Sequence, residues 1–326
     1  MSEEIEELKT MSVAETLSNM RLDVGLVKAG LSETRSQGQK LIDNKKVLIN
    51  GKPEKASYKL QIGDSIEVSV PAPKSIDLVP YDFPIEVIFE DDSVIVVNKP
   101  AGLVVHPAYG HENDTLINAL LFRKTQLSNS QDAFRPGLVH RIDKGTSGLL
   151  VLAKNESAHN HLAKQFLKKT IHRKYWAMTF SRPRQAEGTI SSHLMRDPRN
   201  RQRFQSTDNP EGKLAISHYK TLLSNPSFSL LEMKLETGRT HQIRVHLSSL
   251  NLPIVGDDVY NGKKQAKNLK NQELKKLILN MDRFCLHAKE LGFNHPETHE
   301  NLMFTSKIPE DLAQVFELGG FSDFLE

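Results

Sequence analysis

Hydrophobic and polar residues alternate along several short segments of this chain, and the alternation predicts β-strands. The clearest case runs from Leu231 to Glu236, where Leu, Met and Leu alternate with Glu, Lys and Glu. Residues 65–70 alternate in the same way after a Gly-Asp turn signal. The continuous apolar run from Leu149 to Ala153 predicts another strand, and residues 86–89 and 94–97 predict a hairpin.

Apolar residues that recur three or four positions apart predict helices between these strands. Residues 21–28 and 34–44 predict two short helices near the start of the chain. Asn155, Asp114 and Thr240 are N-cap candidates for three more, because their side chains can accept a hydrogen bond from the first helical turn. Strands that alternate irregularly with helices in this way are typical of an α+β fold.

The same pattern divides the chain into segments. Residues 1–18 are polar and acidic, and we expect a flexible arm there. Residues 19–72 combine two short helices with a few short strands, which predicts a small domain. Residues 73–83 are rich in proline and predict a semi-rigid linker. Residues 84–326 are long enough for a larger domain with its own hydrophobic core.

Composition narrows the class of protein. A hydrophobic fraction of 38% and a charged fraction of 25% are ordinary for a soluble globular protein. No window approaches the ~18 apolar residues that a membrane span needs, and the acidic start does not resemble a secretory signal. The single cysteine, Cys285, excludes an intramolecular disulfide and a zinc site built from several thiolates. We therefore expect a cytoplasmic protein.

Positive charge is concentrated in one part of the chain, although the net charge is only +3. Lysine and arginine exceed acidic residues between Lys164 and Lys213, a distribution that can neutralise phosphates. Within that stretch lies a basic segment interrupted by proline, RDPRNRQR, which carries Arg196, Arg199, Arg201 and Arg203. We expect these arginines to contact the phosphate backbone of a nucleic acid.

Candidate chemistry is concentrated in residues 135–154, RPGLVHRIDKGTSGLLVLAK. This loop carries Arg141 and Asp143 and runs directly into the strand that begins near Leu149. A carboxylate and a guanidinium on a turn braced by rigid structure can be positioned accurately enough for catalysis. Taken alone, however, an aspartate before Lys-Gly-Thr-Ser is more often a turn or cap residue.

This loop closely resembles the signature segment of the pseudouridine synthases that act on large-subunit ribosomal RNA. Five further segments resemble that family in the family's order: VIVVNKPAGLVVHP, HRKYWAM, ETGRTHQIRVHL, PIVGDDVYNG and RFCLHAKELGF. Upstream, residues 20–52 resemble an S4 domain, a small RNA-binding module. The loop departs from the family at Ile142, usually Leu, and at Gly145, usually acidic, and we expect the glycine to loosen it.

The resemblance implies a mixed, mostly antiparallel sheet and the isomerisation of uridine to pseudouridine. That reaction breaks the N1–C1′ bond, turns the base and joins C5 to C1′, so it needs no redox cofactor, group donor or metal. It also implies 23S ribosomal RNA or the large ribosomal subunit as the partner of a monomeric enzyme. Two alternatives stay open: a related synthase for other ribosomal or transfer RNA uridines, and an inert S4-type RNA-binding or assembly factor.

By the same resemblance, Asp143 is the catalytic residue, acting either as a nucleophile or by a route through a glycal. Arg244 is its basic partner, with Arg239 as the rival for that role. Tyr175 would stack on the target base, and alternation along its strand puts it opposite Trp176, away from the apolar face. Two residues complete the expected site, with Arg141 filling the space left by a flipped nucleotide and Leu286 giving an apolar wall.

Overall fold

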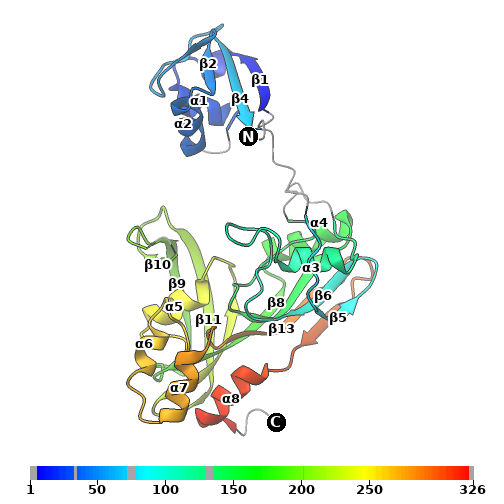
Figure 1. Cartoon of the computed structure of the whole chain (residues 1–326), viewed down its shortest axis with the longest axis vertical. Helices are drawn as coiled ribbons and strands as arrows, with labels where there is room; N and C mark the ends of the chain where they lie inside the picture. The colour runs from blue at the N-terminus through cyan, green and yellow to red at the C-terminus, as the bar shows by residue number, and fades with distance from the viewer. Residues whose placement is uncertain (1–5, 33–34, 72–77, 129–134, 201, 323–326) are drawn as a thin grey trace. The chain divides into compact units, whose positions relative to one another are not determined.

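The computed structural model describes residues 6–32, 35–71, 78–128, 135–200 and 202–322. The chain divides between Ile76 and Asp77 into two compact units, each with a separate hydrophobic core (Figure 1). Among the described residues, no helix combines the length and the apolar composition that crossing a membrane requires.

The smaller unit packs two helices against a four-stranded sheet with the order β1-β4-β2-β3. The elements are β1 (Glu6–Ser12), a 3-10 turn (Glu15–Leu17), α1 (Leu22–Lys28), α2 (Arg35–Asp43), β2 (Val47–Ile49), β3 (Lys52–Pro53) and β4 (Ser65–Pro71). Its core contains Leu22, Leu26, Leu60, Ile66 and Val68, all fully buried. The two helices expected from the apolar spacing are therefore present.

The expected flexible arm over residues 1–18 is wrong for its described part. Residues 6–12 form β1, which pairs antiparallel with β4 along its whole length. Val13 and Leu17 then enter the core of the small unit. The sequence hid this strand because main-chain hydrogen bonds to an open sheet edge need no apolar pattern, and Leu8 is in fact exposed.

The larger unit is built on one ten-stranded sheet. Its order is β10-β9-β11-β12-β8-β13-β7-β6-β5, and β14 pairs with β13; β13 and β7 are parallel, and the other pairs are antiparallel. The strands are β5 (Glu86–Glu90), β6 (Val94–Lys99), β7 (Ser147–Ala153), β8 (His172–Phe180), β9 (Glu187–Arg196), β10 (Phe204–Thr207), β11 (Lys213–Ser224), β12 (Phe228–Leu235), β13 (Leu286–Asn294) and β14 (Asn301–Thr305). The expected α+β fold with a mixed, mostly antiparallel sheet is confirmed.

Helices lie at both ends of this sheet. They are α3 (Leu116–Phe122), α4 (Glu156–Leu167), α5 (Gln242–Ser249), α6 (Gly262–Ala266), α7 (Gln272–Asn280) and α8 (Glu310–Leu318). Figure 1 shows α3 and α4 near β5 and β6, whereas α5, α6 and α7 gather on the side of β9 and β11. Asn155 caps α4 as expected, but Thr115 rather than Asp114 caps α3, and the N-cap of α5 is His241 rather than Thr240.

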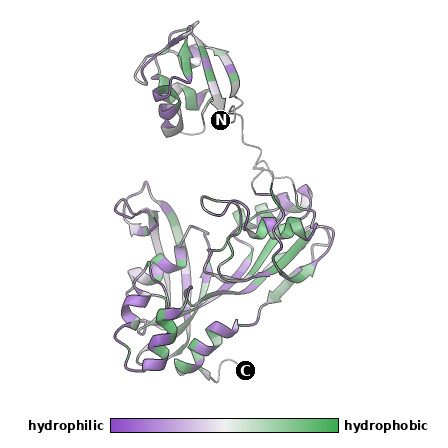
Figure 2. Cartoon of the chain, viewed as in Figure 1, coloured by the Kyte–Doolittle hydropathy of each residue, from purple (hydrophilic) through white to green (hydrophobic). Residues whose placement is uncertain are grey.

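Strand β7 is buried along its whole length. Leu150 and Leu152 belong to the main core, whereas Leu149 and Val151 belong to a second core on the opposite face, beneath α4. Figure 2 shows apolar residues along these central strands and polar ones on the outer sides of the helices. The strand that follows the candidate loop is therefore held from both sides.

The expected linker over residues 73–83 is wrong for its second half, because residues 78–83 pack onto the larger unit. Leu78, Tyr81 and Phe83 contact the main core. The main chain of Tyr81 donates a hydrogen bond to the carbonyl of Asn118. Residues 73–77 lie outside the described residues.

Candidate active site

Main-chain hydrogen bonds fix the loop that carries Asp143. The Thr146 N–H donates to the Asp143 carbonyl at 3.0 Å, which closes a tight turn, and the Gly102 N–H donates to the Lys144 carbonyl at 2.8 Å. A Cβ on Gly145 would lie 2.8 Å from the ring of Phe284, so the turn packs closely there. The glycine that we expected to loosen the loop instead lets the loop approach this ring.

A fully buried lysine donates hydrogen bonds to the main chain of the same loop and of the segment before it. Lys99 ends β6, and its ammonium group donates to the carbonyls of Pro100, Leu103 and Lys144 at 2.7, 2.9 and 3.4 Å. Burial and the nearby Arg283 charge, opposed in part by Asp143, together lower the pKa of Lys99 to about 7. No local pattern predicted this role, because in the sequence Lys99 looks like an ordinary polar residue at a strand end.

Arg244 lies between two carboxylates. Its Nε and Nη2 donate to Asp257 at 2.7 and 3.0 Å, while its Nη1 lies 3.6 Å from Oδ2 of Asp143. The Asp257 side chain is fully buried and that of Arg244 is 5% exposed, whereas that of Asp143 is 19% exposed. The arginine is therefore oriented by the buried carboxylate and presents its remaining edge to the accessible one.

Two aromatic rings complete the surroundings of the guanidinium. Its central carbon lies 4.2 Å from the ring centroid of Phe284 and 4.9 Å from that of Tyr260. Burial by itself lowers the pKa of Arg244, but the hydrogen bonds and charge of Asp257 and the charge of Asp143 raise it above its ordinary value. A permanent positive charge therefore stands beside Asp143.

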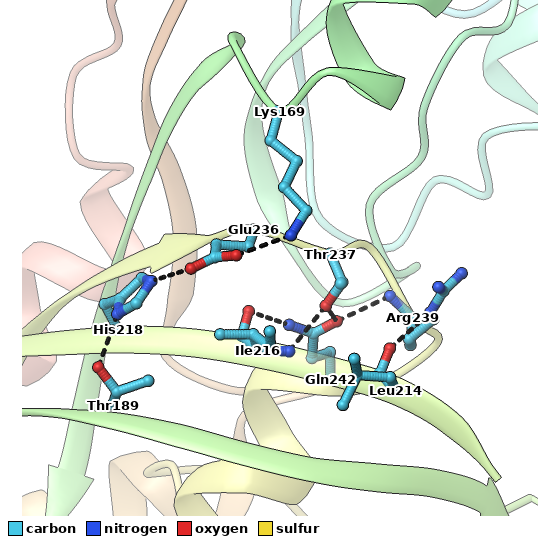
Figure 3. A network of polar contacts seen from close by, with 9 residues as sticks. All are labelled: Lys169, Thr189, Leu214, Ile216, His218, Glu236, Thr237, Arg239 and Gln242. Carbon is cyan, nitrogen blue, oxygen red and sulfur yellow. Dashed lines mark hydrogen bonds and ion pairs between the residues drawn. The ribbon is translucent and has the colours of Figure 1, made fainter.

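The loop that leads into α5 is held by Gln242, as Figure 3 shows. The Gln242 side-chain oxygen accepts from the Thr237 hydroxyl and from the Arg239 N–H, and its nitrogen donates to the Ile216 carbonyl. The Arg239 Nε donates to the Leu214 carbonyl at 3.1 Å. Arg239 is therefore bound to β11, and it is Arg244 that lies against Asp143.

Tyr175 lines the same recess as Asp143 and lies opposite Trp176 on β8 as expected, but its face is the more deeply buried one, not the less apolar one that we expected. Arg173, Tyr175 and Ala177 form the more deeply buried face, and Tyr175 is 5% exposed, whereas Trp176 is half-buried. Burial raises the pKa of Tyr175, Arg173 lowers it and Asp143 raises it, so the phenol stays protonated near neutral pH. Alternation misled here because Tyr175 fills core space while its edge reaches the recess.

A recess and a wider groove meet at Asp143. The recess has a volume of about 60 Å³, and Tyr175, Leu286 and Arg239 are among its lining residues. The groove has a volume of about 730 Å³, and Arg141, Asp143 and Arg244 line both cavities. Leu286 is buried and gives the recess an apolar wall, and Arg141 is exposed at the junction.

The described arginines of the basic segment RDPRNRQR lie in different environments. Arg196 lines the groove, with its guanidinium 5.3 Å from the ring centroid of Phe204. Arg203 instead lies over Tyr260, 5.4 Å from the ring centroid. Arg199 is exposed in the turn between β9 and β10, and Arg201 lies outside the described residues.

The main feature that the sequence did not reveal is how Tyr260 joins this hairpin to the site. Its hydroxyl accepts from the Phe204 N–H at 2.9 Å and lies 3.0 Å from Nδ1 of His241. Asp257 and Tyr260 both fall in PIVGDDVYNG, a segment that the resemblance marked without assigning a role to either residue. Their spacing from Arg244 along the chain does not indicate the contact.

The arrangement can support covalent or proton-transfer chemistry. A carboxylate that is partly exposed at the meeting of two cavities can attack an electrophilic carbon or accept a proton. A fixed guanidinium beside it can stabilise negative charge that develops there. Within the part of the chain that the structure describes, no group of three or more His, Cys, Asp or Glu side chains could hold a metal ion.

Comparison with known proteins matches both units to the families that their sequence motifs resemble. Residues 93–249 match a family model described as RNA pseudouridylate synthase, and residues 20–66 match the S4 domain model. An uncharacterized RNA pseudouridine synthase of Bacillus subtilis is 39% identical over 307 residues, covering 94% of this chain and 96% of the relative. Ribosomal large subunit pseudouridine synthase D of Zymomonas mobilis is 41% identical over 263 residues, covering 80% of this chain and 81% of that protein.

Solved structures agree with the fold. The human protein RNA Pseudouridylate Synthase Domain Containing 4 superposes with a TM-score of 0.53 and 25% identity, over 71% of this chain and 92% of that one. Fold, sequence matches and the order of the motifs thus converge. The chain belongs to the RNA pseudouridylate synthase family, enzymes that isomerise uridine to pseudouridine, and it carries an S4 domain ahead of the catalytic unit.

Proposed function

We propose that this chain isomerises specific uridines of 23S ribosomal RNA, as a monomer, with Asp143 as the nucleophile. The observation that carries the proposal is the contact of 3.6 Å between Asp143 and Arg244 where recess and groove meet. Similarity to a protein named ribosomal large subunit pseudouridine synthase D supports the choice of RNA.

In this proposal the target uridine leaves the RNA stack and enters the cavity beside Asp143. The carboxylate attacks C1′ as the N1–C1′ bond breaks, which leaves the uracil as an anion with its charge on N1. The uracil turns, and C5 bonds to C1′ as the carboxylate leaves. C5 then loses its proton and N1 takes one up, so the product is an isomer of uridine. Tyr175 stacks on the turned base and Leu286 supplies the apolar wall. Arg141, exposed at the junction, fills the space that the flipped nucleotide vacates, which offsets part of the few kcal/mol that unstacking costs.

The test replaces Asp143 with Asn in the chromosomal gene and maps pseudouridines across all cellular RNA. We expect the loss of specific 23S sites, because the amide has the shape of the carboxylate but neither its charge nor its nucleophilicity. Asp92→Asn is the matched control, since it removes an exposed carboxylate outside the groove. Circular dichroism of the purified variants checks that both are folded.

The result also separates the alternatives. Loss of sites only in transfer RNA or in other ribosomal RNA would replace the proposed substrate and keep the chemistry. If Asp143→Asn loses no site while deletion of the gene does, the role assigned to Asp143 is wrong. If neither change removes a site, the chain acts as an RNA-binding or assembly factor.

A further inference from the structure

A fully exposed aromatic side chain lies on a hydrogen-bonded turn beside the groove. Tyr109 occupies the second position of a turn from Ala108 to His111, whose two outer residues exchange main-chain hydrogen bonds of 3.1 and 2.8 Å. Gly110 follows with a φ of 81°, a left-handed conformation that glycine adopts without strain. The relative exposure of Tyr109 is 103%, so nothing in the described chain covers its ring.

This turn is tied to the catalytic loop. The Lys144 ammonium, adjacent in sequence to Asp143, lies 3.0 Å from Nε2 of His111. Because a lysine can only donate, Nε2 accepts, and Nδ1 is left to donate to Asp114 at 2.7 Å. The Gly110 N–H donates to Glu112 at 3.0 Å. These contacts hold the main chain of the turn that carries Tyr109 in a defined position relative to the Asp143 loop.

The ring also lines the same groove as Asp143. The neighbouring cations of that groove include Arg141, Lys144 and Arg196. A groove that combines cations for the RNA backbone with an exposed aromatic ring is typical of surfaces that bind unpaired nucleotides, since every base offers a face on which the ring can stack.

We propose that Tyr109 stacks on an unpaired base next to the target uridine and thereby sets how the RNA lies along the groove. The proposal deepens the proposed function, on which it rests for the identity of the ligand. A base stacked on Tyr109 fixes the nucleotide next to the target uridine relative to Asp143. Tyr109 therefore positions the substrate and takes no part in the bond changes.

The test measures binding of an in vitro transcript of 23S ribosomal RNA by the full chain across a series of salt concentrations. Tyr109→Ala should weaken binding by at least about fivefold, because stacking contributes about 1–3 kcal/mol per base. The dependence of affinity on salt should not change, since the tyrosine ring carries no charge and pairs with no phosphate. Tyr109→Phe and Tyr109→Trp should bind like the parent, and Leu167→Ala, which shortens an exposed side chain outside the groove, is the control.

Each other outcome overturns the proposal. Wild-type affinity for Tyr109→Ala rules out stacking, and a changed salt dependence means that the loop positions cations instead. Equal weakening in Tyr109→Phe and Tyr109→Ala assigns the effect to the hydroxyl rather than to the ring. Repeating the binding series in the Asp143→Asn background separates this result from the proposed reaction, because binding is measured without product formation.

Discussion

At the scale of single residues, the candidate site depends on the carboxylate of Asp257, which does not line the groove. Asp257 is absent from the lining of both cavities, yet it accepts the shortest hydrogen bond of the Arg244 guanidinium, at 2.7 Å, and also accepts from the N–H groups of Val259 and Tyr260. It therefore fixes both the arginine and the start of the segment that carries Tyr260. We regard it as a positioning residue for Asp143.

Replacing Asp257 with Asn should impair both stability and turnover. The amide removes the charge that balances a buried guanidinium, and breaking a buried ion pair from one side costs about 3–5 kcal/mol. We expect a lower midpoint of urea denaturation, and a lower kcat with little change in KM, because Arg244 no longer faces Asp143 squarely. Glu236→Gln, which breaks more exposed contacts with Lys169 and His218, should alter neither. An unchanged kcat in a folded Asp257→Asn variant would contradict the positioning role.

Lys99 leads to a prediction about pH. Its pKa is about 7 in the folded protein and near the ordinary value of 10.5 when unfolded. Below the folded pKa both states bind the proton, so the cost of burying the charge is fully present. As pH rises from about 7 towards 10.5 the unfolded state binds more protons, and the folded state gains stability. Between about pH 6 and about pH 9, urea denaturation should therefore show the free energy of unfolding of the wild type rising relative to that of Lys99→Met. A constant difference would show that Lys99 titrates normally.

The sequence located Asp143 and Arg244 because a local motif carries each of them. It placed Tyr175 in the candidate site and opposite Trp176, but took that face of the strand for the less buried one, since two-residue periodicity cannot tell which of two flanking layers is deeper. It did not reveal Asp257, Phe284 or Lys99 as partners of the site. Their contacts join separate elements, and only the folded chain brings those elements together.

At the scale of elements, the β9–β10 hairpin forms one wall of the groove through Arg196, Gln202 and Phe204. The Tyr260 hydroxyl holds the turn end of this hairpin by accepting a hydrogen bond from the Phe204 N–H. Alternation and turn signals predicted strands such as β4 and β12, but no strand was predicted where β9 and β10 lie. The strand β1 was also missed, because it depends on an edge provided by β4. The hairpin's relation to the site follows from the sheet order, which no local pattern contains.

The arginines of the hairpin should separate by function. Arg196→Ala with Arg199→Ala should weaken RNA binding and reduce the slope of log affinity against log salt by up to about 0.9 for each phosphate that is no longer neutralised. Arg203→Ala should act mainly on stability, because that side chain packs on Tyr260. The paired control is Arg182→Ala with Arg184→Ala, two exposed arginines before β9. Wild-type binding and slope in the Arg196/Arg199 variant would rule out a phosphate-binding hairpin.

At the scale of the whole molecule, each of the two units buries a core of its own. The small unit encloses residues such as Leu22 and Ile66, and the large unit encloses the two faces of its sheet. The division could be anticipated from the proline-rich segment between them. The exact point could not, because residues 78–83 have the composition of a linker but pack against the main core.

Removal of residues 1–76 should therefore leave a folded catalytic unit. We expect one cooperative thermal transition, and a near-UV circular dichroism spectrum that keeps the contribution of the larger unit, since the main core keeps all of its members. Affinity for 23S transcripts should fall, and its salt dependence should weaken, because the S4 domain contributes its own RNA contacts. Aggregation or loss of the cooperative transition would show that the units depend on each other for stability.

Strand β7 has a consequence for the slow motions of the catalytic unit. It is covered on both faces, pairs with β6 along one edge and meets β13 at its start, immediately after the turn that carries Asp143. Its amide protons should consequently exchange with deuterium only when the entire catalytic unit opens, so the Asp143 carboxylate is anchored to the slowest-exchanging part of the protein.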